Sequence, residues 1–317
     1  AERYDLGAAY AAKTAKWLST CTKFHSWGLL ELRKVIFLDA DTLALRPIDS
    51  LAEHTSAFAA APVHVVGGVA LLRFVRHPMD SVTYAQKMLD LRSALGSAGV
   101  LHEILDRGLS LHTLPGLAEL HAATWQTNEW LTTDAEGDVV VYERWGAVDP
   151  ERLTADFPVE ELTRWSVYRF EARALLLDAL SRRARRVVRF TIVVDVQGLT
   201  LAHRKCLPHI KEWIGGDANK TVPPLRSKTH LVGVGSVAAK LIKFALSAFA
   251  SEYQKQTTVV LSGDPFDDAD FAARFSRARL PADVSGELRT GADGRCCLGI
   301  ELPALSDAEA LWSTYLR

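Results

Sequence analysis

Residues 190–195 read Phe-Thr-Ile-Val-Val-Asp, a short apolar run in which four residues are β-branched. A run of this length and composition is typical of a strand that is buried on both faces of a sheet. Gly198 follows it as a turn signal. The stretch therefore predicts a buried strand, and the segments on either side predict what surrounds it.

Strands and helices alternate around this run. Residues 139–143 and 257–261 predict two further strands, and residues 203–213 predict a helix. One long amphipathic helix is indicated by apolar residues that recur at intervals of three and four: Leu162, Trp165, Tyr168, Ala172, Leu175, Leu176 and Ala179. Such an alternation predicts an α/β fold with a mostly parallel sheet and helical cover.

The longest apolar stretch runs from Leu231 to Ala250 and has nearly the length of a membrane span. Lys240 and Lys243 lie inside it and two glycines interrupt its start, so we expect a strand followed by an amphipathic helix over residues 236–249. Apolar residues surround much of that helix: Val237, Leu241, Phe244, Leu246 and Phe249. It is either a core helix with two snorkelling lysines or the cover of a cavity that meets a bilayer when it opens.

Residues 130–301 resemble the CRAL-TRIO lipid-binding family. The resemblance is carried by four segments in the order of the family: Asp134-Ala-Glu-Gly-Asp-Val-Val-Val-Tyr-Glu-Arg-Trp-Gly-Ala-Val-Asp149, Tyr168-Arg-Phe-Glu171, Ile192-Val-Val-Asp-Val-Gln-Gly-Leu199 and Leu280-Pro281. It implies one small hydrophobic lipid in an apolar cavity floored by the sheet, and a gate helix matching residues 236–249. The five apolar residues of that helix would then form the gate and cavity. The implied partners are the lipid and, transiently, a membrane surface.

A second pattern lies near the start of the chain. Residues 34–43 read Lys-Val-Ile-Phe-Leu-Asp-Ala-Asp-Thr-Leu, an apolar run that delivers Asp39 and Asp41 to the end of a predicted strand. Two carboxylates at such an edge can share a divalent cation that binds a pyrophosphate, although Asp pairs also begin solvated turns. A haloacid-dehalogenase-type phosphatase is a less favoured alternative, because Thr42 follows the second aspartate directly.

Residues 15–118 resemble glycosyltransferase family 8, the glycogenin-like enzymes of GT-A fold. The matching segments are Thr22-Lys-Phe-His-Ser-Trp27, residues 34–49, Phe58-Ala-Ala-Ala-Pro62 and Gly68-Val-Ala-Leu-Leu-Arg73. The resemblance implies Mn²⁺ on Asp39 and Asp41, a nucleotide near Lys23 and the donor sugar near Gly68. The later His-x-x-Gly-x-x-Lys-Pro-Trp segment of the family is absent from the sequence, so the module is interpreted as incomplete. A manganese-dependent hexosyltransferase that uses a UDP-sugar is therefore the second hypothesis, with no catalytic residue assigned.

The length and composition of the chain are consistent with two modules. With 317 residues, 48% of them apolar, the chain is long enough for two domains. We expect a partial GT-A-like segment over residues 1–120, a linker over 121–133 and a CRAL-TRIO-like domain over 134–317. A net charge of −1 gives no overall attraction to nucleic acid, and no such partner is predicted. The first residues lack the features of a signal peptide, which favours a cytoplasmic protein that is peripheral to membranes.

Overall fold

The computed structural model describes residues 59–60, 63–64, 81–222, 225–289 and 302–315, and divides the chain into two compact units, Ala1–Gly68 and Val69–Arg317. In the first unit the described residues form one antiparallel pair, β1 (Ala59–Ala60) and β2 (Val63–His64). The predicted site residues of the first module, Lys23, Asp39, Asp41 and Gly68, lie outside the described residues. The manganese and UDP-sugar site stays a prediction.

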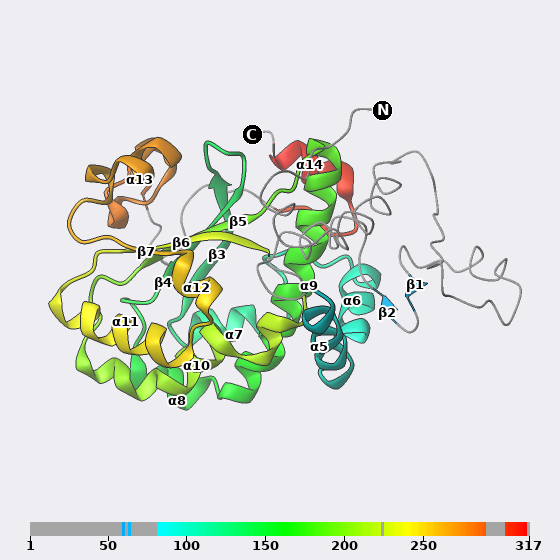
Figure 1. The fold of residues 1–317 in the computed structure, drawn as a ribbon, viewed down its shortest axis with the longest axis horizontal. Helices are drawn as coiled ribbons and strands as arrows, with labels where there is room; N and C mark the ends of the chain where they lie inside the picture. Colours follow the sequence, from blue (N-terminus) through cyan, green and yellow to red (C-terminus); the bar gives the residue numbers. More distant parts are fainter. Residues whose placement is uncertain (1–58, 61–62, 65–80, 223–224, 290–301, 316–317) are drawn as a thin grey trace, which may run out of the picture. The chain divides into compact units, whose positions relative to one another are not determined.

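The second unit is built on a sheet whose strand order follows the chain, β3-β4-β5-β6-β7 (Figure 1). The first pair is antiparallel and the other three pairs are parallel. The strands are β3 (Gln126–Thr133), β4 (Val139–Arg144), β5 (Phe190–Asp195), β6 (Arg226–Val232) and β7 (Thr258–Val260). The prediction of an α/β fold with a mostly parallel sheet is confirmed.

The crossover segments between the parallel strands lie on one face of the sheet. Crossovers are right-handed in almost all parallel sheets, so strands added in one direction place their connecting helices on the same side. Figure 1 shows α10, α11 and α12 together on that side. The crossovers contain α8 (Pro150–Asp156), α9 (Val159–Ala184), η2 (Leu201–Cys206), α10 (Leu207–Gly215), η3 (Asp217–Lys220), α11 (Ser236–Phe249) and α12 (Glu252–Gln256).

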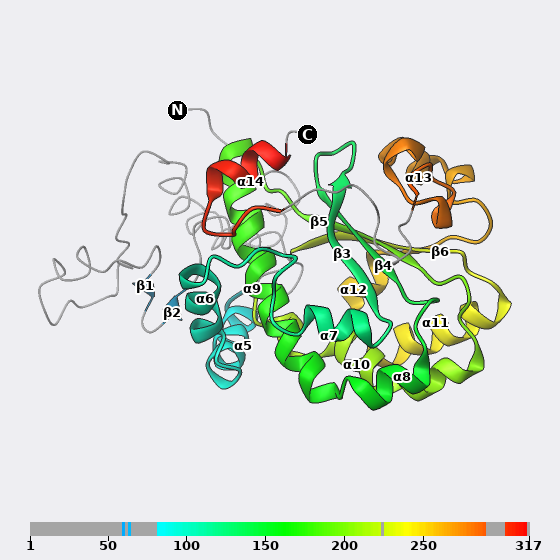
Figure 2. The ribbon, with the colours of Figure 1, turned by 180° about the vertical axis from the view of Figure 1, so that it is seen from behind.

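The opposite face is covered by the segment after β7, in which α13 (Ala269–Arg274) is the longest helix (Figures 1 and 2). Three short 3-10 turns accompany it: η4 (Pro265–Asp267), η5 (Arg277–Arg279) and η6 (Ala282–Val284). One buried cluster joins this segment to the sheet: Val140, Tyr142, Val193, Val232, Phe271, Phe275, Leu280 and Val284. The other face of the same strands, including Val141, Ile192 and Val194, packs toward α9. Burial on both faces is why residues 190–195 are almost continuously apolar.

The predicted strand and gate helix of the long apolar stretch are both present. The long apolar stretch forms the end of β6 and then α11, and the bounds of α11, Ser236–Phe249, coincide with the predicted gate helix. Among the described residues, no helix combines the length and the apolar character that crossing a bilayer requires.

The predicted linker over residues 121–133 differs from the structure, because residues 126–133 form β3. Buried polar side chains such as Thr127 and Glu129 interrupt the apolar pattern of this strand and hide it in the sequence. Three helices before it also belong to the second unit: α5 (Ser81–Ala94), α6 (Ser97–Asp106) and α7 (Leu117–Ala122). Arg92 of α5 ties them to α9 through two hydrogen bonds to Glu171, of 2.5 and 3.0 Å. The last helix, α14 (Ala308–Tyr315), packs on α9 as well.

Candidate functional site

A cavity of about 490 Å³ lies in the second unit, on the face of the sheet that the crossover helices cover. The sheet contributes Phe190, Ile192, Val194 and Leu231 to its wall. These positions share a face because side chains alternate along a strand. Helices α9, α10, α11 and α12 supply many of the other lining residues, and most of the lining is apolar. The cavity falls within the range of about 300 to 1,000 Å³ that is usual for small-molecule sites.

Helix α11 has one face toward the cavity and one toward the outside. Of the five residues predicted to form the gate, Leu241, Leu246 and Phe249 line the cavity. Val237 and Phe244 instead lie on the surface, with exposed fractions of 40% and 52%. The split follows from helical periodicity, since positions seven residues apart fall on the same face. Two residues that the sequence did not single out, Ile242 and Ala245, are buried and complete the inner face.

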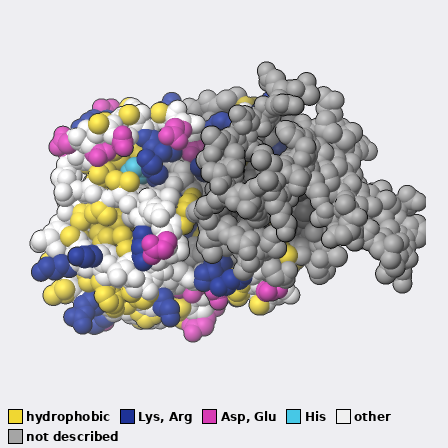
Figure 3. Space-filling model, in the orientation of Figure 1, with side chains coloured by type: hydrophobic (Ala, Val, Ile, Leu, Met, Phe, Trp, Pro, Cys, Tyr) yellow, Lys and Arg dark blue, Asp and Glu magenta, His cyan; other side chains and the backbone are white. Residues whose placement is uncertain are grey.

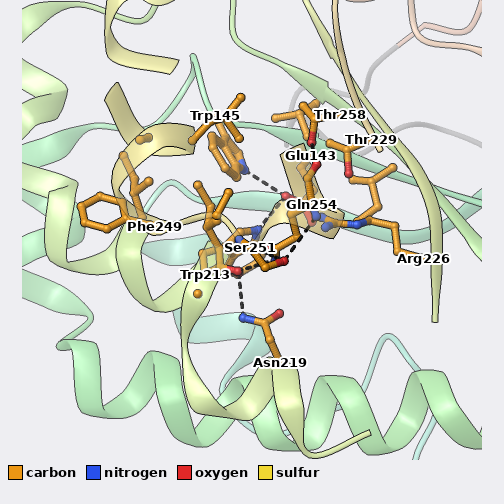
Figure 4. A pocket seen from close by; sticks show the side chains of 18 of the residues that line it. Glu143, Trp145, Trp213, Asn219, Arg226, Thr229, Phe249, Ser251, Gln254 and Thr258 are labelled. Atoms are coloured by element: carbon orange, nitrogen blue, oxygen red, sulfur yellow. Dashed lines mark hydrogen bonds between the residues drawn. The ribbon is translucent and has the colours of Figure 1, made fainter. Parts of the chain in front are cut away.

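Three tryptophans form an aromatic wall of the cavity. The ring centroids of Trp125 and Trp213 are 4.3 Å apart, and Trp145 meets Trp125 edge-on at 6.0 Å. The indole nitrogens of Trp145 and Trp213 both donate to Glu143 Oε2, at 2.9 and 3.0 Å (Figure 4). This carboxylate lies near the carboxyl end of β4, and the wall is thereby fixed to the sheet.

Two carboxylates and two arginines form a buried ion network beside this wall. Arg169 of α9 donates to Glu143 Oε1 and has its Nε 3.2 Å from Glu129 Oε1. Arg173, one turn later, donates from Nε to Glu129 Oε2 at 2.7 Å. Burial opposes ionisation of Glu129, but the two arginines outweigh it and lower its pKa to about 2. Burial and the neighbouring Arg169 lower the pKa of Arg173 to about 10. The network anchors α9 on β3 and β4.

Arg226 and Thr229 of β6 both line the cavity, although they are three residues apart on one strand. Residues at that spacing normally face opposite sides. Here β6 carries an extra residue relative to β5, so Arg226 pairs with Phe190 and Thr229 pairs with Ile192. A bulge of this kind redirects a side chain. Burial lowers the pKa of Arg226, and the nearby Tyr253 and then Glu143 act in the opposite direction. Sequence reasoning missed Arg226, because no periodic signal reveals a bulge.

A thiol is among the groups that line the cavity. Cys206 lines it, but burial and then the charge of Asp149 raise the pKa of its thiol to about 11, which keeps it protonated at neutral pH. Within the described ranges, no three His, Cys, Asp or Glu side chains come together in a way that could hold a metal ion. The site is thus an apolar hollow with a few polar groups at fixed positions.

Comparisons with known proteins add little to this description. No protein-family model matches the chain, and no curated protein matches it. A solved structure titled "Crystal structure of Sfh5" is similar to it with 17% sequence identity and a TM-score of 0.40. The similarity covers 59% of this chain and 62% of that one, so this chain spans less than two thirds of the length of that structure.

Proposed function

We propose that the protein binds one small hydrophobic lipid in the cavity of the second unit, in the manner of a CRAL-TRIO domain. The observation that carries the proposal is the apolar hollow of about 490 Å³ that lies between the sheet and α11. Burial of each acyl methylene would contribute about 0.8 kcal/mol, so an alkyl chain can be held there without a covalent bond.

The size of the hollow limits the ligand. A volume of about 490 Å³ lies in the lower half of the range that is usual for small-molecule sites. A volume of this size favours a ligand with one acyl chain and a small head. A two-chain lipid would require α11 to move outward.

The outer face of α11 supports its role as a gate that meets a membrane. Val237 and Phe244 are exposed on it, and Lys240 and Lys243 are exposed nearby. Figure 3 shows hydrophobic and basic side chains next to one another over this part of the second unit. Apolar side chains flanked by lysines are typical of helices that lie at the surface of an anionic bilayer. Contact with the bilayer would release the lipid into it, or take one up.

Binding can be tested by energy transfer from tryptophan to a fluorescent single-chain lipid, because Trp125, Trp145 and Trp213 line the cavity. We expect saturable transfer at a ratio of one lipid per protein. Replacing the buried Ala245 of α11 with tryptophan fills the cavity and should abolish binding. The matched control is Ala239→Trp, on the exposed side of the same helix, which should still bind. Equal binding by both variants, each with a cooperative thermal transition, would contradict the proposal.

A second candidate function rests on Asp39 and Asp41 alone. The spacing of these carboxylates after an apolar run favours a manganese-dependent hexosyltransferase that uses a UDP-sugar. We expect manganese-dependent hydrolysis of a UDP-sugar that Asp39→Asn abolishes. The absence of turnover in the unaltered protein would remove this candidate.

A further inference from the structure

The charges around the cavity do not balance. Arg169, Arg173 and Arg226 face two carboxylates, Glu129 and Glu143. The other charged residues of the lining are lysines: Lys87 is exposed, and Lys220 pairs with Asp217 at 2.7 Å. The interior of the cavity therefore has one positive charge in excess.

That excess charge is on Arg226. Glu143 Oε1 already accepts from Arg169, and Glu143 Oε2 accepts from two indole groups. Among the residues that the structure describes, the side chain of Arg226 has no ion-pair or hydrogen-bond partner. Arg226 is half-buried in the wall of the cavity, where an anion beside its guanidinium would form a charge-assisted pair. The guanidinium thus presents several unused donors at the wall of an apolar hollow.

A second unsatisfied group lies beside it. Thr229 is 7% exposed, and its Oγ1 has no hydrogen-bond partner among the described residues. The bulge in β6 brings Thr229 to the same wall of the cavity as Arg226. Thr258 of β7 is the strand partner of Thr229 and lines the cavity as well. Figure 4 shows Arg226, Thr229 and Thr258 at one end of the cavity and Phe249 at the other. One end is therefore polar and cationic, and the other is apolar.

Given lipid binding as the function, we infer that the ligand is a single-chain lipid with a carboxylate head, and that Arg226 binds that head. The planar guanidinium fork matches the two oxygens of a carboxylate. One carboxylate balances the one excess charge, whereas a phosphate monoester carries about −1.5 to −2 and would leave the cavity negative. The space that remains suits one chain.

Competition between two lipids of equal chain length tests this assignment on the full-length protein. Oleic acid and oleyl alcohol are each used to displace a neutral fluorescent alkyl probe at pH 8, where the acid is ionised. A charge-assisted pair with Arg226 should make the acid bind roughly 10- to 100-fold more tightly than the alcohol. In Arg226→Met this ratio should fall to near 1, while Arg226→Lys should keep part of it. Arg279→Met, which alters an exposed arginine outside the cavity lining, should leave the ratio unchanged.

Other outcomes would contradict either the carboxylate assignment or lipid binding itself. Equal affinity for acid and alcohol in the unaltered protein overturns the carboxylate assignment and leaves lipid binding intact. Stronger displacement by lysophosphatidic acid than by oleic acid replaces the carboxylate with a phosphate head. Failure of the probe, the acid and the alcohol to bind at all overturns both the assignment and the proposed function. Melting temperatures of the variants show whether each one is folded.

Discussion

His230 lies on the far face of the sheet, in surroundings that oppose its charge. It is 2% exposed and packs edge-on against Phe271 and Phe275, each at 5.3 Å. Neither ring nitrogen has a hydrogen-bond partner among the described residues. Burial first, and then Arg274 and Lys228, lower its pKa from 6.5 to about 4. The native state therefore holds this imidazole neutral.

This pKa predicts that the protein loses stability in mild acid. The unfolded chain binds the proton near pH 6.5 and the native state only near pH 4, so the free energy of unfolding falls as the pH drops through that window. Between pH 8 and pH 5 the loss from this group is roughly 2 kcal/mol. We expect His230→Leu to lose that much less over the same interval in urea denaturation. Parallel pH dependences of the two proteins would contradict the assignment.

Gly146 follows β4 where the chain passes close to the turn after β5. A Cβ atom at this position would lie 1.8 Å from the carbonyl oxygen of Gln197, which is backbone and cannot rotate away. We expect Gly146→Ala to destabilise the fold by roughly 1–3 kcal/mol, measured by urea denaturation. Gly99→Ala is the matched control, since nothing lies within 4 Å of its Cβ position in α6. That change should stabilise the protein by up to about 1 kcal/mol, because alanine favours a helix more than glycine does.

At the scale of elements, α11 could be predicted from the sequence to the residue, and β3 could not. The apolar stretch that ends in α11 is broken by two glycines and two lysines, and these separate a strand from an amphipathic helix. Strand β3 instead buries Glu129, whose charge is satisfied by two arginines on α9, Arg169 and Arg173, 40 and 44 residues later. A pattern in the local sequence cannot reveal an ion pair with residues so far along the chain.

The same limit applies to the candidate site. Apolar periodicity indicated the residues of α11, but it could not tell which of them face inward, and Val237 and Phe244 lie outside the cavity. Arg226 reaches the cavity only because β6 is bulged, and the bulge depends on pairing with β5. Sequence patterns thus predicted most of the helices and strands. Which polar side chains reach the cavity depends on strand pairing between distant segments, which those patterns do not show.

The exposed apolar face of α11 is expected to contribute to binding of the protein to membranes. Phe244 is 52% exposed and its ring meets that of Phe249 edge-on at 6.0 Å, so Phe244→Ser removes a modest amount of packing. We expect this variant to lose about 1 kcal/mol or less of its free energy of unfolding. Its association with anionic vesicles in a sedimentation assay should fall severalfold, because the apolar contact with the bilayer is lost. Leu105→Ser on α6 makes a comparable change at another exposed position and should not alter association. Equal loss in both variants would show that α11 has no special role.

At the scale of the second unit, the two faces of one sheet are used differently. The face toward α13 is filled by aromatic and aliphatic side chains from residues 271–284. The face toward α10 and α11 leaves a hollow of about 490 Å³ with arginines and tryptophans in its wall. An apolar pocket of this size with a few polar groups in its wall is the usual form of a binding site for a small molecule. The proposed function therefore depends on this hollow.

Native mass spectrometry of the full-length protein, purified from cells without detergent, tests the central claim most directly. Lipid binding in the hollow predicts one bound lipid per protein, released on denaturation and absent from Ala245→Trp. A single apo mass after exposure to mixed cellular lipids, or the same adduct in Ala245→Trp, would contradict it.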